Sequence, residues 1–179
     1  PIKRNYEYPV AIWQTNIPTR EKLKIDDEFI KEKLFIAQKY ALTNKAKLLV
    51  TPEGTLSNDF NLGKRIKVNM LAGGFRNFNN ELRSSLLGFQ IGDQSFTSFI
   101  DKNRLVPLGE KIPGFLVKFS RGLSAVGGIQ SGSDSRFFDP KFTPPLAVAI
   151  CYEISDGLKI RNAANSGAEL IITAANLDP

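Results

Sequence analysis

Histidine is absent from this 179-residue sequence, and cysteine occurs once, as Cys151. The lack of histidine excludes Ser-His-Asp and Cys-His catalytic pairs and every zinc site that needs a histidine ligand. A catalytic base in this chain would therefore be a carboxylate, a lysine or a tyrosine. A single cysteine excludes an internal disulfide and leaves the redox compartment open.

Long apolar runs are missing as well. The sequence holds no stretch of about 18 or more apolar residues, and its opening PIKRNYEYP lacks the apolar core of a signal peptide. We therefore expect these residues, taken alone, to be soluble. The chain opens on proline and stops just after an apolar run, so we also expect it to be a segment of a longer protein.

The overall composition is that of a globular domain, with 42% hydrophobic and 23% charged residues. This composition argues against an intrinsically disordered chain. The length suits one domain. A formal charge of +6 would suit an anionic partner, either nucleic acid or an acidic membrane surface, or else a solvated basic face. Lysine and arginine are spread along the chain without a known nucleic-acid-binding motif, so we expect no nucleic-acid partner.

Apolar runs bounded by turn residues predict a succession of strands and helices. One helix is expected from Asp26 or Asp27 to Ala41, and a second over 157–166, closed by Gly167. Strands are expected at 9–15, 46–51, 67–75, 85–92, 95–100, 146–150 and 168–174. The strands 85–92 and 95–100 are expected to form a hairpin. Strand, helix and strand in close succession indicate an α/β layered sheet.

A long region rich in proline, glycine and serine separates the hairpin from the last strands. Its irregular pattern predicts a loop without core elements, and loops of this length are usually functional or mobile. Because apolar and basic residues alternate in its first part, we expect 107–145 to form a membrane-facing lid. The alternative is an ordinary loop packed on its own domain.

Three polar residues stand at the predicted strand exits, where α/β sheets place their active sites. Glu53 and Cys151 each follow a predicted strand directly, and Lys102 opens the loop after the hairpin. Without histidine, a carboxylate can serve a cysteine nucleophile as base, and a lysine can stabilise developing negative charge. Each residue also has a simpler interpretation: inert packing for the cysteine, a turn for PEG and a solvated loop for DKN.

The stretches TPEGTL, DKNRLVPLGEKIP and ICYE together resemble the nitrilase (carbon-nitrogen hydrolase) superfamily and, within it, the apolipoprotein N-acyltransferases. The resemblance runs from about residue 9 to 176. Leu108 replaces a usual phenylalanine, and NLDP near the end departs from the family's usual continuation. Carried over by position, the resemblance implies a catalytic triad of Glu53, Lys102 and Cys151, with supporting roles for Glu110, Tyr152 and Glu153.

The fold that this resemblance implies is an α-β-β-α sandwich, truncated at its C-terminus. Residues 1–179 would be one incomplete nitrilase-like domain, and the membrane-spanning part that precedes this domain in the family would be absent from the chain. The implied location of the whole protein is the bacterial inner membrane, with the catalytic domain on the periplasmic side. No cofactor or metal is implied.

The implied reaction moves an acyl chain from a phospholipid to the N-terminal cysteine amine of an apolipoprotein through a thioester on Cys151. The implied partners are thus a phospholipid donor, an apolipoprotein acceptor and a membrane surface. Two alternatives stay open. Water could resolve the same thioester in a soluble amidase or nitrilase, or the chain could be a basic binding module without catalysis. Activity is expected of the whole protein, and the segment alone could be inactive.

Overall fold

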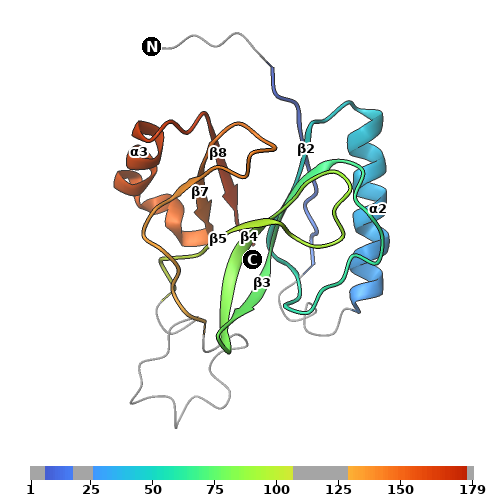
Figure 1. The fold of residues 1–179 in the computed structure, drawn as a ribbon, viewed down its shortest axis with the longest axis horizontal. Helices are drawn as coiled ribbons and strands as arrows, with labels where there is room; N and C mark the ends of the chain where they lie inside the picture. Colours follow the sequence, from blue (N-terminus) through green and yellow to red (C-terminus); the bar gives the residue numbers. More distant parts are fainter. Residues whose placement is uncertain (1–6, 18–25, 107–128, 177–179) are drawn as a thin grey trace.

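A computed structural model describes residues 7–17, 26–106 and 129–176 of the chain. The described strands form two sheets, with the orders β1-β2-β3-β4-β5 and β6-β7-β8. In Figure 1 the helices α2 and α3 lie on opposite sides, with both sheets between them. This arrangement confirms the α-β-β-α sandwich expected from the sequence. The elements are β1 (Val10–Ile12), α2 (Asp27–Thr43), β2 (Leu48–Leu56), β3 (Asn69–Phe78), β4 (Glu81–Phe89), β5 (Ser98–Asp101), β6 (Phe137–Phe138), β7 (Leu146–Ile150), the short 3-10 helix η2 (Cys151–Ser155), α3 (Gly157–Asn165) and β8 (Leu170–Ala174).

Helix α2 begins where the sequence predicted. The side chain of Asp26 accepts a hydrogen bond from the backbone N–H of Glu28, at 3.2 Å, and so caps the helix. Asp27 and Glu28 add negative charge to the first turn, and this charge stabilises the helix by its interaction with the helix dipole. Ile30 and Leu34 are buried on one face of the helix and pack on the five-stranded sheet. The acidic start and the apolar stripe therefore fix both the beginning and the orientation of α2.

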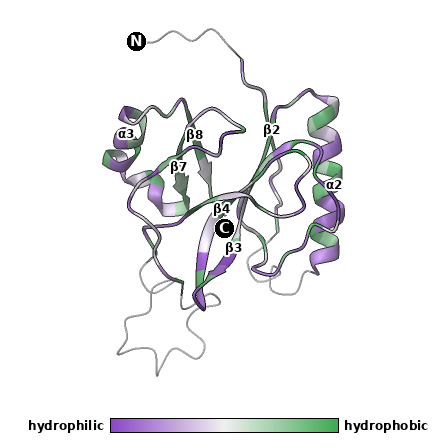
Figure 2. Cartoon of the chain, viewed as in Figure 1, coloured by the Kyte–Doolittle hydropathy of each residue, from purple (hydrophilic) through white to green (hydrophobic). Residues whose placement is uncertain are grey.

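Alternation along the strands builds two separate cores. In β2, Leu49 belongs to the core beneath α2, whereas Leu48 and Val50 face the second sheet, because successive side chains of a strand point to opposite faces. All five residues of β7 are buried, as expected for a strand covered on both faces. Figure 2 shows hydrophobic residues along β7 and β8 and hydrophilic ones at the tip of the β3–β4 hairpin.

The structure contains two hairpins, and the sequence analysis predicted only the second of them. β4 and β5 pair antiparallel, which confirms the predicted hairpin. β3 and β4 also pair antiparallel, through a tight turn at Asn79 and Asn80, whose φ angles are 51° and 63°. Asparagine tolerates this left-handed region better than most residues do. This turn lets β3 extend to Phe78 and β4 begin at Glu81, beyond the strand limits predicted for them.

The second half of the expected lid contributes several side chains to the core. Ile129, Arg136 and Phe138 are buried, and β6 pairs with β7. The expectation of a loop without core elements was therefore wrong for residues 129–145. That prediction relied on the lack of a regular apolar pattern, but side chains of an irregular segment can also be buried. The first half of the expected lid, 107–128, lies outside the described residues. Among the residues that the structure describes, no helix is both long and apolar enough to cross a membrane.

Candidate active site

The sequence analysis placed Glu53 directly after a strand, but in the structure Glu53 lies inside β2. The pairing of β2 with β3 shifts register between Thr51 and Leu56, so Glu53 sits in an irregular part of the strand. The opposing residue is Gly73, where a β-carbon would collide with the Pro52 carbonyl oxygen and lie 2.6 Å from the Glu53 α-carbon. Glycine at 73 therefore allows this part of β2 to approach β3 and aims Glu53 at the site.

Lys102 follows β5, as predicted, and its side chain is fully buried. Its Nζ lies 2.9 Å from Oε1 of Glu53, whose side chain is 13% exposed. Ser84 Oγ donates to the same oxygen at 3.1 Å, and the backbone N–H of Lys102 donates to the Ser84 carbonyl oxygen at 2.8 Å. Burial of the ammonium requires a charged partner, which Glu53 supplies. Sequence reasoning missed Ser84 because nothing in its local sequence marks it.

Cys151 directly follows β7, as predicted, and is the first residue of η2, where it is partly exposed. Its φ angle of 54° places it in the left-handed region, which is strained for a residue with a side chain. Burial raises the pKa of the Cys151 thiol, and repulsion from Glu53 raises it further, whereas Lys102 lowers it. Hydrogen bonding to Glu53 also raises it. The structure thus brings Glu53, Lys102 and Cys151 together, with a protonated thiol beside a carboxylate.

Glu153 is almost fully buried two residues after Cys151. Its Oε1 accepts from the backbone N–H groups of Asn103 and Arg104, at 2.7 and 3.0 Å, and its Oε2 accepts from that of Ile150, at 2.9 Å. Glu153 therefore joins the loop that follows Lys102 to the end of β7. This carboxylate holds the backbone on both sides of the site, and its supporting role in catalysis stays a prediction.

The other two expected supporting residues differ in what the structure says of them. Tyr152 is 47% exposed, and the Arg104 guanidinium carbon lies 4.7 Å from its ring centroid, a cation–π contact at the surface beside Cys151. Glu110 lies outside the described residues. In the described part of the chain, no cluster of three or more acidic or cysteine side chains is arranged to hold a metal ion.

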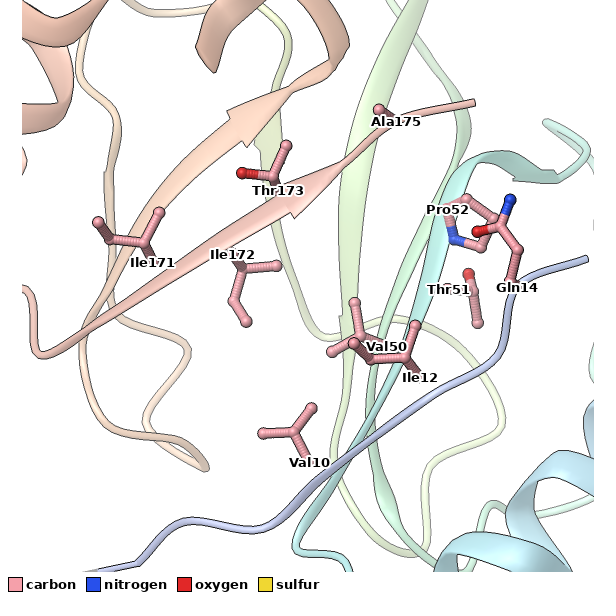
Figure 3. A pocket seen from close by; sticks show the side chains of 10 residues that line it. All are labelled: Val10, Ile12, Gln14, Val50, Thr51, Pro52, Ile171, Ile172, Thr173 and Ala175. Atoms are coloured by element: carbon pink, nitrogen blue, oxygen red, sulfur yellow. The ribbon is translucent and has the colours of Figure 1, made fainter. Parts of the chain in front are cut away.

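A mostly apolar hollow lies between β1, the end of β2 and β8 (Figure 3). Pro52, the residue before Glu53, forms part of its wall. Ile12 and Ile171, at the edges of the two sheets, are 76% and 60% exposed. The full lining consists of Val10, Ile12, Gln14, Val50, Thr51, Pro52, Ile171, Ile172, Thr173 and Ala175. The link between this hollow and the proposed triad is therefore Pro52, which precedes Glu53 in β2.

Comparison with known proteins finds relatives that match the whole length of the chain. The chain is 73% identical, over all 179 residues, to an apolipoprotein N-acyltransferase of Prochlorococcus marinus subsp. pastoris strain MED4. The chain is thus homologous, over its whole length, to part of the curated apolipoprotein N-acyltransferases. It covers 36% of that relative's length. An apolipoprotein N-acyltransferase of Parasynechococcus marenigrum strain WH8102 is 43% identical over 172 residues, which make up 95% of this chain and 37% of the relative.

The chain therefore spans about a third of the length of the curated apolipoprotein N-acyltransferases that it matches. Solved structures agree on the fold. An amidase of the nitrilase superfamily from Nesterenkonia AN1 has a TM-score of 0.65 at 13% identity, and Saccharomyces cerevisiae Nit3, also of that superfamily, has 0.61 at 17%. Each comparison covers 94% of this chain and 64% of the other. No protein-family model matches the chain.

Proposed function

We propose that the protein transfers an acyl chain from a phospholipid to the α-amino group of an N-terminal cysteine on an apolipoprotein. One observation carries this proposal: a partly buried Glu53–Lys102 pair, 2.9 Å apart, adjoins the single cysteine of a chain that is 73% identical to an apolipoprotein N-acyltransferase. We propose that Glu53, Lys102 and Cys151 are the catalytic residues, and that Glu110, Tyr152 and Glu153 support them.

In the first half-reaction, Cys151 Sγ attacks the ester carbonyl of the phospholipid while Glu53 takes the thiol proton. Lys102 stabilises the negative charge that develops on the carbonyl oxygen. The tetrahedral intermediate collapses, the bond to the lysophospholipid oxygen breaks, and Glu53 returns the proton to that oxygen. The raised pKa of Cys151 suits this course, because the thiol stays protonated until the carboxylate removes its proton during attack. A thioester on Cys151 remains.

In the second half-reaction, the free amine of the acceptor cysteine attacks the thioester carbonyl. Glu53 accepts a proton from the attacking amine, the carbon–sulfur bond breaks, and the thiolate of Cys151 takes up the proton. The products are an amide and the free enzyme. Transfer instead of hydrolysis requires that the amine reach the thioester before water does, so the acceptor and the membrane surface are proposed partners.

The location and the domain limits belong to the same proposal. We place the whole protein in the bacterial inner membrane, with this domain on the periplasmic side, where phospholipid and lipoprotein substrates meet. Residues 1–179 would form part of one nitrilase-like domain. The similarity to relatives of about three times this length supports a larger whole protein.

The test uses the protein at its natural length with phospholipid vesicles and a synthetic diacylated lipopeptide whose N-terminal cysteine has a free amine. We expect mass spectrometry to detect an acylated lipopeptide and, when the acceptor is omitted, a mass increase of one acyl chain on the peptide that contains Cys151. The variant Cys151→Ala should give neither product.

Two controls separate transfer from hydrolysis. An acceptor with a blocked α-amine should remain unmodified, while the acyl group accumulates on Cys151. Release of free fatty acid from vesicles, or of ammonia from simple amides, without any acylated lipopeptide would reject the transferase and favour the amidase alternative. Acyl transfer by Cys151→Ala at the wild-type rate would reject the assignment of Cys151 as the nucleophile.

A further inference from the structure

Arg136 is one of the most deeply buried large side chains in the described part of the chain, with 2% of its surface exposed. Its Nη1 donates to both carboxylate oxygens of Glu153, at 3.0 and 2.9 Å. Its Nη2 donates to the backbone carbonyl oxygens of Asp101, at 3.0 Å, and Ser133, at 2.6 Å. One guanidinium thus binds three separate segments of the chain.

Two of these segments carry proposed catalytic residues. Asp101 immediately precedes Lys102, and Glu153 comes two residues after Cys151. Arg136 and Glu153 bridge these two backbones, because Glu153 also accepts from the backbone N–H groups of Asn103 and Ile150. The loop before β6 packs on the same strand end, because a β-carbon at Gly132 would collide with that of Asp101. The position of Lys102 relative to Cys151 therefore depends on the contacts of Arg136.

We propose that Arg136 is a positioning residue, which sets the separation between the Lys102 ammonium and the Cys151 thiol by tying the end of β5 to η2 through Glu153. Arg136 lies behind the reacting groups, and no role in proton transfer is assigned to it. Its importance for acyl transfer rests on the proposed function. Its control of the thiol environment does not, because alkylation of Cys151 reports on that environment without any substrate.

An arginine is needed for geometric reasons as well as for charge. The guanidinium presents five N–H donors in a rigid plane, so it can bind a carboxylate and two carbonyl oxygens at once. A lysine at 136 would keep a cation beside Glu153, but a single ammonium on a flexible stem cannot span the same three acceptors. Arg136→Lys therefore keeps the positive charge beside Glu153 but removes the hydrogen bonds that position the three segments. It also avoids leaving Glu153 buried without a cation.

The experiment compares wild type and Arg136→Lys at the natural length of the protein. Iodoacetamide alkylation of Cys151 is followed by mass spectrometry as a function of pH, and kcat and KM are measured for acyl transfer. We expect kcat to fall about 100-fold with little change in KM, since a misplacement of about 1 Å costs that much. We also expect the midpoint pH of alkylation to fall toward that of an ordinary thiol, because Cys151 leaves the burial and the Glu53 contact that raise its pKa.

The matched control is Gln38→Met. Gln38 is equally buried, and its Oε1 accepts from the Lys67 backbone N–H at 2.9 Å, but it lies in the other core, beneath α2. Its loss should lower Tm without moving the alkylation midpoint. An alkylation midpoint at the wild-type value in Arg136→Lys overturns the proposal, whatever the change in Tm. If wild type itself shows no acyl transfer, the proposed function fails, and the midpoint alone decides on Arg136.

Discussion

At the scale of single residues, the site depends on two groups in unfavourable surroundings. Lys102 is completely buried as an ammonium and is stabilised there by Glu53, 2.9 Å away. Cys151 is held in a strained left-handed backbone conformation, and burial raises the pKa of its thiol. Strain and desolvation of this kind accumulate where a fold arranges reactive groups. The hydrogen bonds that surround the site offset the free energy of this strain and desolvation.

The first prediction concerns the ionisation of Cys151. In wild type, the midpoint pH of iodoacetamide alkylation should lie above that of N-acetylcysteine in the same buffer. Glu53→Gln should lower it, because it removes the negative charge that opposes thiolate formation. Glu81→Gln, a change in an exposed carboxylate on β4, is the matched control and should leave the midpoint unchanged. Equal midpoints in wild type and Glu53→Gln would contradict the assignment of Glu53.

The second prediction concerns Lys102 and applies to the proposed reaction. Lys102→Met should reduce kcat for acyl transfer by about 100- to 1,000-fold, the usual effect of removing one group that stabilises an oxyanion. Lys141→Met is the control, since the side chain of Lys141 is 84% exposed and forms an ion pair with Asp139 at the surface. A kcat within twofold of wild type for Lys102→Met would remove Lys102 from the mechanism.

At the scale of secondary-structure elements, the irregular part of β2 is what aims Glu53. A regular strand would keep Pro52 and Glu53 in ladder register with β3, whereas the shift between Thr51 and Leu56 releases them. Gly73 makes this possible, because its missing side chain leaves room for the Pro52 carbonyl. The element that carries the proposed base is thus shaped by a glycine on its neighbour.

The third prediction tests that dependence. Gly73→Ala should push Glu53 away from Lys102, lower kcat for acyl transfer and destabilise the protein by about 1–3 kcal/mol, as overpacking usually does. Gly157→Ala is the control, since no atom outside its chain neighbours and its own helix lies within 4 Å of a β-carbon there, and α3 begins at this residue. Thermal unfolding and kcat, measured on both variants, check the prediction. Wild-type values for Gly73→Ala would show that β2 can shift without loss.

At the scale of the whole molecule, packing of the two sheets brings separate parts of the chain to one place. Glu53 comes from β2, Lys102 follows β5, and Cys151 follows β7. Beside them, Asp101 forms a second buried cluster: Arg76 donates to its carboxylate at 2.7 and 2.6 Å, and Ser85 Oγ donates at 2.7 Å. This cluster ties the three adjacent strands β3, β4 and β5 together.

The fourth prediction is a dependence of global stability on pH. Burial alone would raise the pKa of Asp101, but hydrogen bonds from Arg76 and Ser85 outweigh it and hold the pKa below its usual value. A lowered pKa in the folded state adds stability above the unfolded value of about 3.9, and this stability is lost as pH falls through the folded pKa. Asp101→Asn should therefore lower Tm clearly at pH 7, and the difference from wild type should narrow as pH falls from about 4 to about 3.

The control for this measurement is Asp59→Asn, which changes an exposed carboxylate and should leave Tm close to wild type at both pH values. The loss at pH 7 for Asp101→Asn should reach about 3–5 kcal/mol, because it leaves the buried Arg76 without its charged partner. A difference in Tm that is the same at pH 7 and pH 3 would show that the ionised form of Asp101 contributes nothing.

The sequence by itself determined the features that depend on neighbours along the chain. The cap at Asp26, the apolar stripe of α2, the buried run of β7 and the end of α3 at Gly167 all follow from local spacing, and the structure agrees with each. The order of the three motifs also selected Glu53, Lys102 and Cys151 as candidates, although their roles remain a proposal. Local spacing suffices here because caps, periodicity and glycine stops act within a few residues.

Only the tertiary structure decided how those residues are held. Ser84 and Glu53 are 31 positions apart, and Arg136 and Glu153 are 17 apart, so no local pattern announces either contact. The same applies to the β2 irregularity, which depends on a glycine in another strand, and to residues 129–145, which read as a loop but bury Arg136. The physical reason is that a buried polar group must find its partner wherever packing brings one, and packing joins segments that are distant in sequence.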